Sequence, residues 1–292
     1  MTGLPVTTIL GAPVSGLVLD HIHWFGVSSW RWLLILEALP AILGGVSTYF
    51  VLPNNPSEAK FLEPSEKDWL NGEVATERAS KEKHSISILQ TLANGRVCHL
   101  AAINFALLVG LYSLSFWLPQ LVKSFSASYS NTSVGFLVAL PQIIGLAAML
   151  LVSRSSDRRT ERRYQAAIPI SGAGLALALM FITPSTHVSM LLLSVALAGT
   201  YSFFGPFWSM PSEFLSGASA AVGIAFINSV GNLAGFLGPW AIGAISRRTG
   251  STHLGLALAG ISMLISAGLL VALPRVARPM TASRVTPDAA PG

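Results

Sequence analysis

The sequence predicts an all-α integral membrane protein with eight transmembrane helices. Of its 292 residues, 52% are hydrophobic and only 11% are charged, and the mean hydropathy is +0.60. Soluble globular proteins carry about 25% charged residues, so this composition argues against a water-soluble enzyme. High hydrophobicity also argues against intrinsic disorder. Long apolar runs recur as far as Leu273, and nearly every charge lies between them, which indicates a chain that crosses a membrane repeatedly.

Eight apolar runs are long enough to cross the roughly 30 Å of bilayer hydrocarbon, which takes about 20 residues of helix. Strands of a membrane barrel are only about 10 residues long and alternate in polarity, so helices are predicted. The runs contain a single acid or base, Glu37, and many Gly, Ala and Ser residues that suit close helix packing in lipid. The predicted spans are 3–19, 33–52, 97–122, 133–152, 166–182, 188–210, 218–245 and 254–273.

The first run is predicted to be a span and not a signal peptide. Its first 19 residues carry no charged side chain, whereas a secretory signal begins with a basic region. The second run ends at 53–56, whose sequence PNNP is a strong helix stop.

Residues 53–96 form the one long hydrophilic segment, with seven acids and six bases. Its middle, about 65–83, has the composition of a helix, with Ser65 as the cap and Asp68 three residues later. We expect a solvated cytoplasmic helix that joins two membrane bundles, with two spans before it and six after it. The tail 274–292 is rich in Pro, Ala and Thr and is predicted to be disordered.

The orientation follows from the lysines and arginines of the connectors, which are in excess on the cytoplasmic side of membrane proteins. If 53–96 is cytoplasmic, the connectors and tail on that side hold fourteen of these residues. The other side holds four, namely Arg31, Lys123, Arg247 and Arg248. We therefore expect a multi-pass protein of the inner membrane with both termini in the cytoplasm.

Other functional classes find little support in the sequence. The pI near 9.7 could suggest nucleic-acid binding, but the bases lie in short connectors and not on one face. Cys98 and His99 are predicted to be buried packing residues. Asp20, His21 and His23 lack a third firm metal ligand and are expected to be solvated loop residues. No phosphate loop or dinucleotide fingerprint is present, so no cofactor and no metal are predicted.

Several segments together resemble the anion:cation symporter branch of the major facilitator superfamily. Six helices, a long cytoplasmic loop and six more helices make up that fold. The segments are 30–41 (WRWLLILEALPA), 50–56 (FVLPNNP), 64–70 (PSEKDWL), 115–120 (SFWLPQ), 217–233 (GASAAVGIAFINSVGNL) and 235–239 (GFLGP). The similarity covers about residues 3–273.

The resemblance implies that the eight spans correspond to helices five to twelve of the fold. Residues 1–52 would hold the last two helices of the N-terminal bundle, 53–96 the central loop, and 97–273 the complete six-helix C-terminal bundle. The first four helices of the family, which normally carry the main proton-linked acid and the bases that neutralise a substrate carboxylate, have no counterpart. A misassigned start, a fragment and a decayed gene remain open as explanations.

The function implied is secondary active transport of small organic anions, carboxylates or sugar acids, coupled to protons and working by alternating access in the lipid bilayer. The full-length form is expected to be a monomer that binds no nucleic acid. A truncated, non-transporting remnant is the first alternative. An intramembrane enzyme is the second, and it lacks a clustered catalytic set in the spans.

Six polar or aromatic side chains are candidates for the substrate site. By resemblance, the aromatic-polar stretch 201–209 and the first Asn of the eleventh helix line the cavity. Gly205 and Pro206 in that stretch can interrupt the helix, while Gly231 and Gly235 can let a neighbouring helix come close. The alternative is that these polar groups only join helices. The candidates are Tyr112, Gln142, Tyr201, Trp208, Asn228 and Asn232.

Five further residues are candidates for gating or coupling. Glu37 lies seven residues after Trp30, about 10 Å into the membrane, and acids there suggest function; a carboxyl hydrogen-bonded to neighbouring helix ends is the alternative. The segment 156–163 (SDRRTERR) resembles the family's second-half gating loop, where Asp157 could pair with Arg158, Arg159 or a basic group at a facing helix end; a positive-inside anchor is the alternative. Trp117 and Gln120 lie near the outer end of their span and could gate or anchor.

Overall fold

The computed structural model describes residues 2–82, 88–158, 162–183, 185–213, 215, 217–250 and 253–274. Within these ranges the regular structure is helical, and eight segments are long and apolar enough to cross a membrane. The helices are α1 (Gly3–His21), α2 (Ser29–Val51), α3 (Pro64–Glu82), α4 (Ile88–Leu92), α5 (Gly95–Ser124), α6 (Asn131–Arg158), α7 (Arg162–Leu179), α8 (Thr186–Ser209), α9 (Gly217–Asn232), α10 (Ala234–Thr249) and α11 (His253–Ala272). The predicted all-α membrane fold is confirmed.

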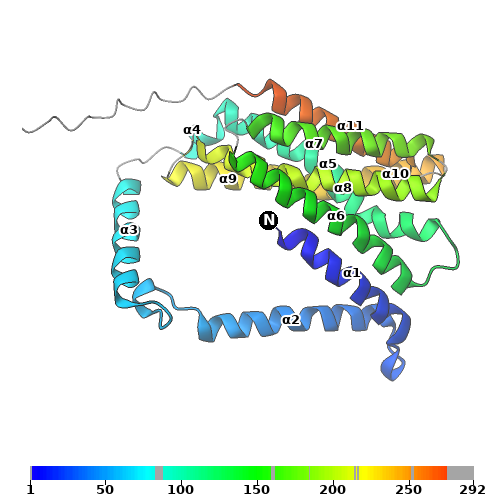
Figure 1. Cartoon of the computed structure of the whole chain (residues 1–292), viewed down its shortest axis with the longest axis horizontal. Helices are drawn as coiled ribbons and strands as arrows, with labels where there is room; N and C mark the ends of the chain where they lie inside the picture. The colour runs from blue at the N-terminus through cyan, green and yellow to red at the C-terminus, as the bar shows by residue number, and fades with distance from the viewer. Residues whose placement is uncertain are drawn as a thin grey trace, which may run out of the picture.

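The helices from α5 onward pack into one bundle around a continuous apolar core. Helix α5 contacts α9, α10 and α11, while α8 packs between α6 and α7, and α11 lies against α7 (Figure 1). Helix α1 packs along α6 at the side of this bundle. We call the end of the bundle at α4 the α4 end, and the end where α5 joins α6 the opposite end.

Small residues bring the helix backbones together. A Cβ added at Gly260 of α11 would lie 2.5 Å from the Gly174 carbonyl oxygen of α7, and one at Gly174 would lie 2.7 Å from the Gly260 carbonyl. Both distances are too short for any side chain. Close approach at glycine pairs is how membrane helices gain packing contact where lipid supplies no hydrophobic driving force between them.

Helix α2 stands apart from the rest. It contacts α1 and buries none of its residues, although its side chains are mostly apolar. In Figure 1 it runs alongside the bundle and joins α3, which lies crosswise at the α4 end. An exposed apolar helix of 23 residues is stable only in a non-aqueous environment such as the bilayer.

Two predicted helices compare differently with the structure. The solvated helix expected at about 65–83 is α3, and its position is confirmed. Ser65 is not its cap, because the helix begins at Pro64 and the Glu66 carboxylate accepts the Glu63 N–H at 3.0 Å.

The span expected over 218–245 is confirmed as one apolar segment, Ser219–Thr249, but it is interrupted at Leu233 and so forms the two helices α9 and α10. Helix α8, by contrast, continues through Gly205 and Pro206, two residues that can interrupt a helix. The predicted disordered tail lies outside the described residues from 275 onward.

Candidate functional site

The break between α9 and α10 is held by a polar cluster that connects it to α5. The Tyr112 hydroxyl donates a hydrogen bond of 2.6 Å to Oδ1 of Asn232. The Asn232 Nδ2 in turn donates to the Asn228 carbonyl oxygen at 2.9 Å. In a regular helix that carbonyl receives the backbone N–H of residue 232. The side chain therefore enters the hydrogen-bond ladder, a recognised cause of helix kinks.

The backbone at the break is correspondingly tightened. The Leu233 N–H bonds to the Val230 carbonyl at 3.3 Å, three residues back, and the Phe236 N–H bonds to the Leu233 carbonyl at 3.2 Å. Such three-residue bonds mark a local departure from α-helical geometry. Leu233 itself keeps helical dihedral angles, and the Leu237 N–H also bonds to its carbonyl at 3.3 Å, so α9 and α10 meet at a local interruption of the hydrogen-bond ladder.

Two glycines let α5 approach this break. A Cβ at Gly231 would overlap the Asn104 amide, and one at Gly235 would lie 3.3 Å from the Tyr112 ring. Asn104 is fully buried and donates through Nδ2 to the Ile227 carbonyl at 3.2 Å. The predicted close approach at these two glycines is therefore confirmed, with α5 as the neighbour.

The cluster offers donors to a ligand. Asn228 is exposed, and its side-chain amide makes no hydrogen bond to another described residue. Asn232 is also exposed and uses one of its two amide hydrogens for the Asn228 carbonyl. Three predicted site residues, Tyr112, Asn228 and Asn232, are thus brought together.

Two other predicted site residues form a separate buried pair. The Tyr201 hydroxyl of α8 donates to Oε1 of Gln142 on α6 at 2.6 Å. Tyr201 is 3% exposed and Gln142 is 2% exposed. A Cβ at Gly145 would lie 2.7 Å from the Tyr201 ring, so this glycine makes room for the ring. As the structure stands, this pair joins α6 to α8 and does not face an open space.

Trp208 lies near the α4 end of α8 and keeps an unsatisfied donor. Its ring is half-buried and packs edge-on against Phe207, with 5.2 Å between ring centroids. The indole Nε1 is buried and has no hydrogen-bond partner. A buried donor without a partner is costly, which is compatible with a site that a ligand completes.

The two candidate gating residues at the α4 end form no ion pair in the described part of the chain. Asp157 and Arg158 are exposed at the end of α6, and neither pairs with another residue of the described chain. The following arginines instead hold helix ends: Arg162 donates to the Ser209 carbonyl at 3.0 Å, and Arg163 donates to the Leu273 carbonyl at 2.5 Å. Cations at carbonyl ends of helices are electrostatically favourable. These docking contacts were not predicted.

Glu37 joins α2 to α1. Its Oε1 accepts a hydrogen bond of 2.5 Å from the Ser15 hydroxyl, although the carboxylate remains exposed. The partner is the middle of a helix and not a helix end. At the opposite end, Trp117 is half-buried, 3.6 Å from where a Gly243 Cβ would lie, and Gln120 is exposed.

Asp20 is a residue whose environment the sequence reading missed. It was expected to be a solvated loop residue, but it lies in the last turn of α1 and is only partly exposed. Its carboxylate accepts hydrogen bonds from the backbone and side chains of Asn131 and Thr132, at the start of α6. Asp20 and Asn131 are 111 positions apart in the sequence, so no local pattern could have revealed the contact.

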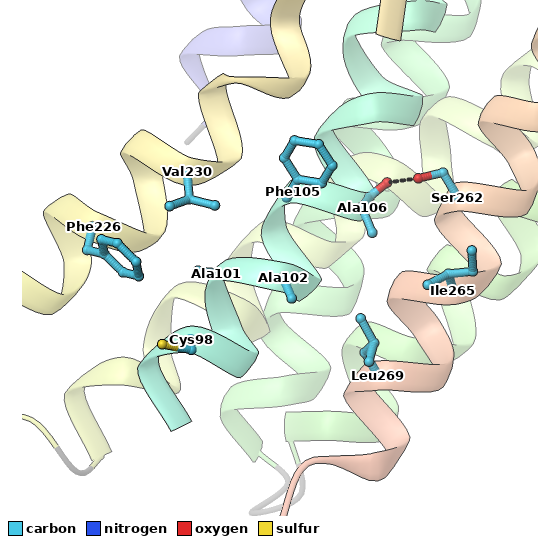
Figure 2. A pocket seen from close by; sticks show the side chains of 10 residues that line it. All are labelled: Cys98, Ala101, Ala102, Phe105, Ala106, Phe226, Val230, Ser262, Ile265 and Leu269. Atoms are coloured by element: carbon cyan, nitrogen blue, oxygen red, sulfur yellow. Dashed lines mark hydrogen bonds between the residues drawn. The ribbon is translucent and has the colours of Figure 1, made fainter. Parts of the chain in front are cut away.

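A groove of about 590 Å³ lies between α5, α9 and α11, and none of the predicted site residues is among those that line it (Figure 2). Its walls are almost entirely apolar, with Phe105, Phe226 and Leu269 among them. The Ser262 hydroxyl, which also lines the groove, already donates a hydrogen bond of 2.8 Å to the Ala106 carbonyl. Cys98 is exposed on this groove, which corrects the prediction that it is buried. The groove offers an anion no donor.

Comparison with known proteins gives the family. A family model described as Major Facilitator Superfamily matches residues 1–239. A "Putative tartrate transporter" of Agrobacterium vitis is 40% identical over 98% of this chain and 66% of its own length. A "Putative metabolite transport protein NicT" of Pseudomonas putida is 33% identical over 94% of this chain and 63% of its own. An "Inner membrane transport protein RhmT" of Escherichia coli is 36% identical over 81% and 54%. The chain thus spans between 54% and 66% of the length of these curated relatives.

Proposed function

Because this chain belongs to the major facilitator superfamily, we propose that it acts in secondary active transport of small organic anions, carboxylates or sugar acids, by alternating access. The names of its relatives as tartrate and metabolite transporters support this substrate class. The observation that carries the proposal is the helix break at Asn232, which sets polar groups inside a membrane span. Discontinuous helices in transporters commonly form the substrate site.

The eight spans are proposed to correspond to helices five to twelve of the superfamily fold. In this arrangement α1 and α2 belong to the first bundle, α3 lies in the central loop, and α5 to α11 form the second bundle. The packing of α5 to α11 around one core supports the last part. The α4 end is then cytoplasmic, and the membrane is the bacterial inner membrane.

The chemistry available for an anion is hydrogen bonding by neutral donors. No Lys or Arg lies inside the predicted spans, so the amides of Asn228 and Asn232 and the Trp208 indole would bind substrate oxygens without a counter-charge. Glu37 is the one acid within a span, and we propose that it takes part in proton coupling. Monomeric function is part of the same proposal.

Uptake of labelled tartrate into proteoliposomes with an imposed pH gradient tests this proposal. Asn228→Ala and Trp208→Ala are expected to lower uptake strongly, because each removes a donor. Thr48→Ala is the matched control, since its hydroxyl bonds to Gly44 within the exposed helix α2. Equal uptake in all three variants would overturn the site assignment. A well-folded chain without uptake of any organic acid would favour the non-transporting alternative.

A further inference from the structure

Asp20 accepts hydrogen bonds from the first backbone N–H groups of α6, a helix far away in sequence. Its Oδ1 accepts from the Asn131 backbone N–H at 3.2 Å and from Asn131 Nδ2 at 2.7 Å. Its Oδ2 accepts from the Thr132 backbone N–H at 2.7 Å and from Thr132 Oγ1 at 2.8 Å. Both carboxylate oxygens are thus used, each by a backbone and a side-chain donor.

The local sequence leaves these particular donors to Asp20. The first N–H groups of a helix have no partner within it. Ser130 caps the next one, since its hydroxyl accepts the Ser133 N–H at 3.0 Å. The N–H groups of Asn131 and Thr132 therefore depend on α1. A carboxylate is well suited to them because it complements the positive end of the helix dipole and forms charge-assisted bonds.

The same two helices are in backbone contact directly beside this cap. A Cβ at Gly16 of α1 would lie 2.5 Å from the Asn131 carbonyl oxygen, and a Cβ at Gly135 of α6 would overlap the Ala12 carbonyl. Val18, between Gly16 and Asp20 on α1, is only 6% exposed. At these two glycines no side chain lies between the helix backbones, so separation of the helices at this end would break direct backbone contacts.

We propose that Asp20 and the N-terminus of α6 form a latch that closes the molecule at its opposite end, away from α4. The inference rests on the proposed function in one respect: alternating access makes α1 and α6 parts of two bundles that must separate at this end during the cycle. Opening then requires all four hydrogen bonds of Asp20 to break together. Asp20 is a positioning residue, since it touches α6 and not the proposed substrate site.

A cysteine reporter measures the latch without transport. The native cysteine is replaced by Cys98→Ala, and Val18→Cys places a thiol in the buried seam of the full chain in nanodiscs. Asp20→Asn keeps the shape of the side chain but turns one acceptor toward its partners into a donor. The rate of labelling by a bulky water-soluble maleimide is expected to rise about fivefold in Asp20→Asn, the usual effect of losing a helix cap. Asp68→Asn on the solvated helix α3 is the control and is expected to leave the rate unchanged.

Thr132→Val provides a second test from the other side of the contact. It removes one of the four donors, so a smaller rise of about twofold is expected. Unchanged labelling in both Asp20→Asn and Thr132→Val would overturn the latch. If Asp20→Asn does not yield monodisperse protein, the Thr132→Val result decides alone. Raised labelling in a protein that transports no organic acid would contradict the proposed function and leave the closure by Asp20 established.

Discussion

Tyr112 and Asn232 illustrate how a single side-chain contact can decide a backbone. Asparagine in a helix competes for backbone hydrogen bonds with its amide. Here the Asn232 Nδ2 donates to the Asn228 carbonyl, while the Asn232 Oδ1 accepts a hydrogen bond from the Tyr112 hydroxyl. The tyrosine therefore fixes the orientation of the amide, and the amide fixes the break.

Tyr112→Phe is expected to loosen the break. It leaves the Asn232 Oδ1 without its donor, which corresponds to about 1 kcal/mol of stability. The thermal midpoint in detergent should fall by a few degrees, and uptake should fall with it. Tyr49→Phe is the matched control, because Tyr49 is exposed on α2. An unchanged midpoint in Tyr112→Phe would contradict the proposed link between this hydroxyl and the break.

Gln142 and Tyr201 are expected to be coupled. Tyr201→Phe leaves the buried Gln142 Oε1 without its donor at a cost of about 1–3 kcal/mol, whereas removal of both polar groups can be nearly neutral. Thermal unfolding of Tyr201→Phe, Gln142→Leu and the double variant measures this coupling. If the two losses simply add, the pair does not stabilise the α6–α8 contact in the way its geometry indicates.

At the scale of helices, two glycines of α11 distinguish the effect of helix–helix packing on stability from the effect of intrinsic helix propensity. Gly260 and Gly268 both lie on α11, but a Cβ at Gly260 would lie 2.5 Å from the Gly174 carbonyl, and a Cβ at Gly268 would meet nothing within 4 Å. Gly260→Ala should lower stability by about 1–3 kcal/mol through overpacking against backbone.

Gly268→Ala is the control for that substitution. Alanine is the better helix former, so it should raise stability by about 0.5–1 kcal/mol. Thermal unfolding of both variants in the same detergent gives the comparison. Two effects of the same sign would mean that propensity and not the α7–α11 contact decides the outcome.

The spans could be predicted from the sequence because each is a local property of composition. The solvated helix α3 could be predicted for the same reason, since its charged, helix-forming composition is local. The break at Leu233 could not, because it depends on Tyr112, 120 residues before Asn232. Gly205 and Pro206 gave a stronger local signal for an interruption, yet α8 runs through them within its close packing against α6 and α7.

The candidate site was predictable as a set of residue types and not as an arrangement. Tyr112, Asn228 and Asn232 meet, but Gln142 and Tyr201 bond to each other elsewhere. The pairing of Asp20 with α6 left no trace in local sequence, because its partners Asn131 and Thr132 begin a helix that lies more than 100 residues away along the chain. Long-range partners of polar groups are what a single sequence does not contain.

At the scale of the whole molecule, charge should decide which way the bundle faces. The turn between α6 and α7 carries several arginines, and two of them dock onto the carbonyl ends of α8 and α11. The α4 end therefore combines the excess of cations with contacts that hold them there. Because connectors rich in Lys and Arg stay on the cytoplasmic side of the membrane, we expect the α4 end to face the cytoplasm.

Cysteine labelling in cells tests this orientation. In a Cys98→Ala background, Asn54→Cys reports the α2–α3 connection and Ser128→Cys reports the loop between α5 and α6; both positions are exposed. An impermeant maleimide should label Ser128→Cys in spheroplasts and Asn54→Cys only after permeabilisation, while Cys98→Ala alone stays unlabelled. The reverse pattern would place the α4 end outside, and Asp20 would then close the cytoplasmic side. Because the latch and the arginine-rich turn lie at opposite ends of the same helix, α6, one labelling experiment fixes the side of both.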